Sequence, residues 1–247
     1  MSRAGALLFA LALSCTSAAD TALAEGNRLA AAGKLDEAAQ RFRAACEKTQ
    51  AARPRELLGM VLHASGKADE ARAAWLEAAQ LEPGAPDAQL GLARIDTERG
   101  DHAAALDRLD RLVQRQPARA DARLLRAVVL LQRNAEGDVD RALTDTELAV
   151  RAAPRDADAL YVRGTALLAA KQLDAAKPLF EGLKTARPRL AAWGLARLAA
   201  AQSRSIDVIV HLREAREASD GGWVKARVRE DPAFRYLWDD PEFSREF

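Results

Sequence analysis

The chain has 247 residues, with 37 Lys and Arg against 36 Asp and Glu, so its formal net charge is +1. Charged residues make up 30% and hydrophobic residues 49%, a composition typical of a folded chain and not of a disordered one. Both signs of charge are interleaved, and no basic stripe carries aromatic side chains, which argues against nucleic-acid binding. Aromatic residues are only 5%, which favours many small seams between helices over one large core.

The N-terminus, residues 1–19, has the order of a secretory signal. Arg3 provides a positive start, residues 4–13 form an apolar run, and small residues follow. The apolar run is too short for a membrane-spanning helix, which needs roughly 20 residues. We therefore expect an exported bacterial protein whose folded part begins near residue 20.

The cleavage chemistry leaves alternatives open. Ala12-Leu13-Ser14-Cys15 resembles a bacterial lipobox, in which residues 1–14 would be the signal and Cys15 would be lipidated. It departs from the usual pattern, whose third residue before the cysteine is Leu and whose second is small. Ordinary cleavage after residue 19 or residue 24 is the second reading, and an uncleaved cytoplasmic start is the third.

Four prolines farther along the chain mark a repeat. Pro83, Pro117, Pro154 and Pro188 lie 34, 37 and 34 residues apart, and each follows the same amphipathic pattern. A period near 34 residues is typical of helix–turn–helix arrays. We delimit the repeats at about 19–51, 52–85, 86–119, 120–156 and 157–190, with a degenerate sixth at 191–220.

Small residues recur at the eighth and twentieth positions of the repeat, and a large residue recurs at the twenty-fourth. The residues that carry this pattern are Gly26, Ala38 and Phe42, then Gly59, Ala71 and Trp75, then Ala105, and then Gly164, Ala176 and Phe180. The pattern resembles the tetratricopeptide repeat family. That resemblance implies an all-α, right-handed superhelical solenoid of about six repeats over residues 20–220.

Each position of that pattern has a physical role in the expected fold. The small residues let the two helices of a repeat approach closely, and the large residue fills the gap to the next repeat. Each proline is expected to end the second helix, because it cannot continue the hydrogen-bond ladder. The fourth repeat carries three extra residues, which we place around Asn134 to Asp138.

The tail, residues 221–247, differs from the repeats. It contains Asp-Pro-x-Phe twice, at residues 231–234 and 240–243, and each Asp-Pro is typical of a helix N-cap with proline in the first turn. We expect two or three short helical turns that cap the last repeat, similar to the end-of-group segment that follows many bacterial tetratricopeptide arrays. The alternative is an aromatic patch that binds a partner.

Residues suited to catalysis or metal binding are scattered. His63, His102 and His211 have no ligand partners at metal spacing, and the chain contains no phosphate loop and no GxSxG motif. Cys46 has no second cysteine besides Cys15, and we expect it to pack as a small apolar residue. We expect no catalytic residue, no metal and no cofactor, and hence no enzyme.

The resemblance also implies which side chains face a ligand. In the family these come from the second, fifth, ninth and twelfth positions of each first helix. The matching residues are Asn27, Glu56, Met60, His63, Leu90, Arg94, Leu124, Val128, Leu131, Tyr161, Thr165 and Leu168. The lysine that a carboxylate clamp needs at the fifth position is absent. The competing reading is that Leu124, Val128 and Leu168 only pack against adjacent helices.

The function expected from these features is a non-catalytic scaffold, exported to the bacterial cell envelope, that binds a helix or peptide of a partner protein in its groove. Its membrane contact would be the lipid on Cys15, at the outer membrane or another envelope surface, and otherwise it would be periplasmic. Neither nucleic acid nor a small-molecule substrate is expected. In length and repeat number the chain resembles the pilotins of type IV pilus systems, which help an outer-membrane secretin assemble. A pilotin-like lipoprotein is therefore one alternative, and a soluble regulatory module is another.

Overall fold

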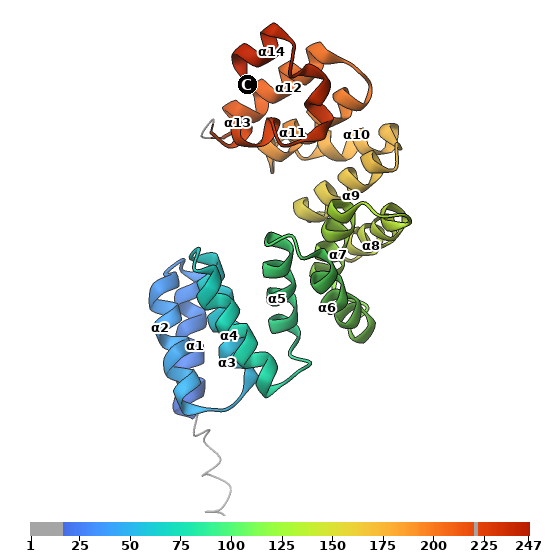
Figure 1. The fold of residues 1–247 in the computed structure, drawn as a ribbon. Helices are drawn as coiled ribbons and strands as arrows, with labels where there is room; N and C mark the ends of the chain where they lie inside the picture. Colours follow the sequence, from blue (N-terminus) through green and yellow to red (C-terminus); the bar gives the residue numbers. More distant parts are fainter. Residues whose placement is uncertain (1–16, 220–221) are drawn as a thin grey trace, which may run out of the picture. The chain divides into compact units, whose positions relative to one another are not determined.

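The computed structural model describes residues 17–219 and 222–247, so Cys15 and most of the predicted signal lie outside the described residues. All regular structure in these ranges is helical, and consecutive helices pack in pairs joined by short turns (Figure 1). The predicted all-helical fold of helix–turn–helix repeats is thereby confirmed. The chain divides into two compact units between Arg108 and Leu109, inside one helix.

The first unit contains three first helices and their partners. They are α1 (Ala18–Ala31), α2 (Leu35–Lys48), α3 (Ala52–Ala64), α4 (Ala68–Leu81), α5 (Pro86–Glu98) and the first half of α6 (His102–Arg115). The second unit continues the pattern and ends in the tail. Its further helices are α7 (Ala120–Arg133), α8 (Asp138–Ala152), α9 (Ala157–Ala169), α10 (Leu173–Gly182), α11 (Pro188–Ala201), α12 (Ser205–Glu217), α13 (Gly222–Val228), the 3-10 helix η1 (Pro232–Leu237) and α14 (Pro241–Glu246).

Aromatic rings lie directly against glycine backbone at the seams between repeats. Trp75 on α4 is buried between Gly59 on α3 and Gly91 on α5, and a Cβ atom at either glycine would come closer than 3.0 Å to the indole. Phe180 on α10 lies in the same way between glycines of α9 and α11. One ring thus joins the first helices of two successive repeats. All the predicted small and large packing residues, from Gly26 to Phe180, are buried.

The three extra residues of the fourth repeat are spread over three places. Helix α7 has 14 residues against 13 in α3, and α8 has 15 against 14 in α4. The turn between them covers residues 134–137, one residue more than the turn at 65–67. Asp138 closes this longer turn: its carboxylate accepts hydrogen bonds from Arg133 Nε at 2.9 Å and from the Ala135 N–H at 2.9 Å.

Helix ends follow the expected rules with one exception. Helices α4, α6 and α8 each end two residues before a proline, as expected. Pro188 does not close α10, which already ends at Gly182; instead it is the first residue of α11, where a missing N–H costs no helix bond. The first repeat lacks a closing proline, and there the buried Arg55 donates to the carbonyl oxygens of Thr49 and Ala51 at 3.0 and 3.1 Å.

A buried ion-pair network holds α7 against α8. The Asp145 side chain on α8 is only 1% exposed and accepts hydrogen bonds from Arg123 at 2.8 Å and from Arg126 at 2.7 and 2.8 Å. Hydrogen bonding to Asp145 raises the pKa of Arg126 above its ordinary value. Arg126 also donates to Asp110 Oδ1 at 2.8 Å. Because a buried charge without its partner is costly, this network fixes how α7 packs on α8.

The tail packs on the last helix pair. Helix α13 contacts α12, and η1 contacts α11. Trp193 on α11 makes edge-on ring contacts with Trp223 at 5.0 Å and with Phe234 at 5.3 Å between centroids. Asp231 caps η1 by accepting from the Ala233 N–H at 3.0 Å, and Asp240 accepts from the Phe243 N–H at 2.9 Å ahead of α14. Both Asp-Pro motifs therefore start short helices, as expected.

Substitution of Gly91 by alanine is predicted to destabilise the first unit by about 1–3 kcal/mol, because the new Cβ meets the Trp75 ring and the seam has no room to relax. Gly182→Ala is the matched control. No atom lies within 4 Å of a Cβ placed at Gly182, so this variant should be neutral or up to about 1 kcal/mol more stable. Denaturant unfolding measures both free energies, and equal stability of the two variants would contradict the seam described above.

Replacement of Asp138 by asparagine is predicted to lower the free energy of unfolding at neutral pH by about 1–3 kcal/mol, through lost charge-assisted hydrogen bonds. The Arg133 guanidinium holds the pKa of Asp138 below its ordinary value of 3.8. A lowered carboxyl pKa stabilises the fold above the ordinary value, and this contribution is lost as pH falls through the lowered one. The difference between wild type and variant should thus stay constant from about pH 5 to 8 and shrink below about pH 4. Unfolding curves across this range test it; a difference that grows on acidification would contradict the assignment.

Candidate functional site

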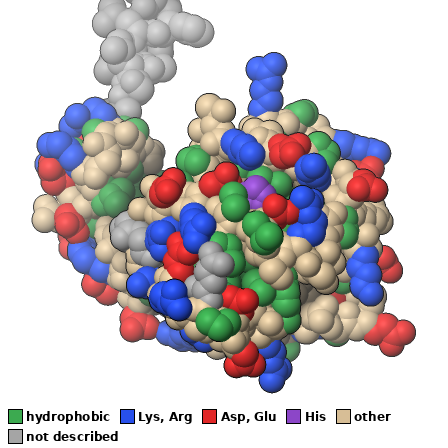
Figure 2. Space-filling view, turned by 90° about the horizontal axis from the view of Figure 1, so that it is seen from above, with side chains coloured by type: hydrophobic (Ala, Val, Ile, Leu, Met, Phe, Trp, Pro, Cys, Tyr) green, Lys and Arg blue, Asp and Glu red, His purple; other side chains and the backbone are tan. Residues whose placement is uncertain are grey.

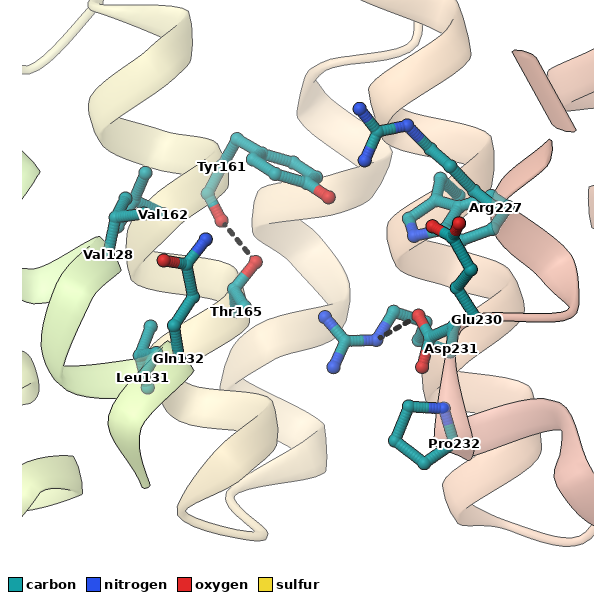
Figure 3. A pocket seen from close by; sticks show the side chains of 12 residues that line it. Val128, Leu131, Gln132, Tyr161, Val162, Thr165, Arg227, Glu230, Asp231 and Pro232 are labelled. Carbon is teal, nitrogen blue, oxygen red and sulfur yellow. Dashed lines mark hydrogen bonds and ion pairs between the residues drawn. The ribbon is translucent and has the colours of Figure 1, made fainter. Parts of the chain in front are cut away.

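A hollow of about 540 Å³ opens in the second unit between three successive first helices and the tail (Figure 3). Helices α7 and α9 form one wall, α11 forms the base next to them, and the segment from α13 to η1 forms the opposite wall. The residues that line it are Val128, Leu131, Gln132, Tyr161, Val162, Thr165, Trp193, Arg197, Arg227, Glu230, Asp231 and Pro232.

The wall from α7 and α9 is mostly apolar. Val128 and Leu131 on α7 lie three residues apart, so the helix turns both to one side. Tyr161 and Val162 on α9 also line the hollow, and all four residues are half-buried. The Tyr161 ring packs 6.0 Å from the Phe180 ring, and burial raises the pKa of the Tyr161 hydroxyl. Thr165 Oγ1 donates to the Tyr161 carbonyl at 3.0 Å, which satisfies the threonine hydroxyl within its own helix.

The opposite wall is charged. Asp231 Oδ2 lies 3.2 Å from Arg197 Nε as an ion pair, although the two atoms are not aligned for a hydrogen bond (Figure 3). The Arg227 guanidinium lies 4.9 Å from the centre of the Trp223 ring, and Arg189 lies 4.7 Å from the same ring. Each cation–π contact helps to hold an arginine in place, and of the two only Arg227 lines the hollow.

The structure brings together only part of the predicted groove of the second unit. Val128, Leu131, Tyr161 and Thr165 line the hollow. Leu124 is half-buried and does not line it, and Leu168 packs against the cluster around Phe180. For Leu168 the competing reading, packing between helices, therefore agrees with the contacts.

In the first unit the predicted groove residues fall into two groups. Asn27, Met60 and Arg94 are exposed, and Met60 is 48% exposed despite its apolar side chain. His63 is half-buried and its Nε2 lies 3.0 Å from Glu98 Oε1. None of these side chains lines the hollow of the second unit.

Glu56 and Leu90 are corrections to the predicted groove, because both are buried. Glu56 Oε1 accepts hydrogen bonds from the backbone N–H groups of Asp87 at 2.9 Å and Ala88 at 3.1 Å, in the first turn of α5. The carboxylate therefore binds the N-terminus of the next first helix, where the helix dipole favours a negative charge. It holds two repeats together and is not available to a partner.

Eight of the twelve residues that line the hollow were not predicted from the sequence. Arg197 and Trp193 lie on the degenerate sixth repeat, and Arg227, Glu230 and Asp231 lie in the tail. The repeat pattern assigns ligand-facing positions only to the first helix of each regular repeat. It assigns none to the tail, which folds back beside these helices. The Asp231-Pro232 motif was the one signal available, because it predicted where η1 starts and hence where the charged wall turns.

The described residues hold no group of three or more His, Cys, Asp or Glu side chains that is placed to bind a metal ion. Cys46 is half-buried, and burial raises the pKa of its thiol, as suits an apolar packing role. In the described part of the chain, no helix is both long and apolar enough to cross a bilayer. On the face that Figure 2 displays, basic and acidic side chains are interleaved and neither sign dominates.

Comparisons with known proteins agree with this architecture. Two models of the tetratricopeptide repeat match the chain, one at residues 62–129 and the other at residues 23–88 and 135–191. No curated protein sequence matches it significantly.

Solved structures share the fold at low sequence identity. A thermophilic tetratricopeptide repeat protein from Thermus thermophilus is 24% identical, with a TM-score of 0.61 over 72% of this chain and 96% of that one. The pilF protein of Pseudomonas aeruginosa is 15% identical, with a TM-score of 0.66 over 93% and 98%. YrrB, described as a tetratricopeptide repeat protein with an unusual peptide-binding site, is 18% identical, with a TM-score of 0.55 over 78% and 100%.

The repeat models, the helix pairs and the glycine–aromatic seams all agree, and the chain belongs to the tetratricopeptide repeat family.

Proposed function

We propose that the protein is a non-catalytic interaction module that binds a peptide or helix of a partner protein in the hollow of the second unit. The observation that carries the proposal is the half-buried apolar wall of α7 and α9 facing a charged wall across about 540 Å³. Repeat arrays use such surfaces, built from successive first helices, to bind proteins. The peptide-binding site in the description of YrrB supports this mode of action by analogy of fold.

We further propose that the protein is exported and carries its lipid on Cys15. The capping box of α1 supports this choice of cleavage site. Ser17 Oγ accepts from the Asp20 N–H at 3.1 Å, and the Asp20 carboxylate accepts from the Ser17 N–H at 3.1 Å. Cleavage before Cys15 keeps both bonds, whereas cleavage after Ala19 removes Ser17 and a buried residue of α1 with it.

The alternatives rest on the same architecture. The length and repeat number of this chain favour a pilotin-like lipoprotein that assists secretin assembly. The fold also agrees with that of pilF over nearly all of both chains, so the two chains have similar lengths. A soluble regulatory module, periplasmic or cytoplasmic, would use the same hollow without a lipid anchor. Lipidation and the identity of the captured partner separate the three.

Val162→Glu is predicted to abolish partner binding without unfolding the array, because it places a charge in the apolar wall where a partner would bury it. The measurement is capture from a solubilised envelope fraction on immobilised protein, read by mass spectrometry. Val210→Glu is the matched control, since Val210 on α12 is 42% exposed and does not line the hollow.

A specific protein retained by wild type and by Val210→Glu, and lost with Val162→Glu, is the expected result. Circular dichroism must show the same helix content and melting temperature for both variants. If folded Val162→Glu retains the same proteins as the wild type, the hollow is not the working surface and the proposal fails.

Cys15→Ser is predicted to move the protein from the membrane fraction to the soluble fraction, because a thioether-linked lipid can form only on cysteine. Fractionation with metabolic labelling by a radioactive or clickable fatty acid measures both effects. Label that persists in the variant, or a wild type that is already soluble and unlabelled, would exclude the lipid anchor.

A further inference from the structure

We propose that the hollow binds the apolar face of an amphipathic helix of the partner protein, and not an extended segment. This inference rests on the proposed function, because it names the conformation and the chemistry of the occupant at the same site. The face that enters the hollow would carry aliphatic or aromatic side chains and no charge.

The described residues that line the hollow offer no backbone N–H groups with which an extended segment could pair. On the tail wall, the N–H groups of Glu230 and Asp231 donate to the Arg227 carbonyl at 3.1 and 3.0 Å. Pro232 has no N–H, and the Ala233 N–H donates to the Asp231 carboxylate at 3.0 Å. The other lining residues lie inside α7, α9 and α11, where each N–H bonds to the preceding turn. Strand addition, which needs a free edge, therefore has no place here.

The uncharged side chains of the hollow could satisfy only a few groups of an extended backbone. The wall of α7 and α9 offers the Gln132 amide and the Tyr161 hydroxyl, while the Thr165 hydroxyl already donates to the Tyr161 carbonyl at 3.0 Å. Each residue of an extended segment brings one N–H and one C=O, and burying these groups without partners is costly. A helix bonds its backbone internally, so only its side chains have to fit the hollow.

The charges of the lining balance and favour an occupant without charge. Arg197 and Arg227 stand against Glu230 and Asp231, so the formal charge of the lining residues is zero. Arg197 and Asp231 already form an ion pair at 3.2 Å. Arg227 and Glu230 are exposed, so water or the polar flank of a bound helix reaches them. A charged side chain inserted into the hollow would lose its hydration without a free counter-charge, which is unfavourable.

The apolar residues of the lining set the face that the helix presents. Val128, Leu131 and Val162 lie on one side of the hollow, with Arg227 and Glu230 on the other (Figure 3). A volume of about 540 Å³ exceeds that of any single side chain, so several side chains enter together. On a helix, side chains three and four residues apart share one face, which provides such a group.

The test is selection by the full-length protein from a library of fully randomised peptides of about 18 residues, long enough for several helical turns. The expected result is enrichment of Leu, Ile, Val, Met or aromatic residues at spacings of three and four. Enrichment at every second position would overturn the proposal in favour of an extended segment. Enrichment of a charged residue at the centre of the apolar motif would overturn it as well.

Fluorescence polarisation with the best peptide tests the helix directly. A proline placed in the middle of the peptide, outside the enriched positions, should weaken binding at least about tenfold, because it interrupts the helix. Proline as the first residue is the matched control and should change affinity by less than about twofold, because the first turn tolerates it. Equal affinities of the two proline peptides would contradict a helical occupant.

The same assay tests the site and the missing charge. Val162→Glu should bind the peptide at least about tenfold more weakly than the wild type, and Val210→Glu should bind it equally well. Between about 0.05 and 0.5 M salt the affinity should not fall by more than about twofold, because no charge pair has to form. A steep loss of affinity with salt would overturn the uncharged face.

Failure of this inference is distinguishable from failure of the proposed function. If the library yields no peptide, or only extended ones, but Val162→Glu still loses its captured partner, the hollow binds proteins and the assigned helix is wrong. If the library yields none and Val162→Glu also captures normally, both are wrong.

Discussion

The contact on which the rest of each unit depends is an aromatic ring pressed against helical glycine. Trp75 touches the backbone of α3 at Gly59 and of α5 at Gly91, and Phe180 touches α9 at Gly164 and α11 at Gly194. One side chain thus sets the distance within a repeat and the distance to the next. Since interiors are packed as closely as organic crystals, a methyl group added at these glycines must move a helix and not merely a side chain. The seam on Phe180 also places α9 and α11 next to each other, and these two helices carry much of the hollow.

Trp193 has a corresponding role at the end of the array. Its edge-on contacts with Trp223 and Phe234 join the tail to α11, and such ring pairs are stabilising beyond the area they bury. Glu246 ties α14 to α12 by hydrogen bonds from Arg213 and Arg216 at 2.7 and 2.9 Å, and these arginines lower its pKa. The tail is therefore held at both ends, and the segment between them, from Arg227 to Pro232, stands across from α7 and α9 as a fixed wall.

How far the sequence predicts this protein differs between the fold and the site. The helix pairs, the closing role of three prolines and the caps at Asp231 and Asp240 follow from local rules, because each depends on residues only a few positions apart. Glu56 shows where such rules end: its repeat position is typical of a ligand contact, yet its carboxylate binds the first turn of α5, 31 residues away. Arg197 and Arg227 were missed for the same reason. Their meeting depends on a tail that folds back, which the period of a repeat does not encode.

Covering the end of a repeat array and binding a ligand in the hollow, as proposed, would place opposite demands on the tail, and the residues that could meet each demand are different. Phe234, Phe243 and Val228 are fully buried and hold the tail in place. Arg227, Glu230 and Arg229 are exposed, and no cap or ring packing in η1 depends on their charge. Because substitutions at exposed sites usually change stability little, the charge of the wall is free to vary while the cap stays folded. A new binding preference could therefore arise in the tail at little cost in stability.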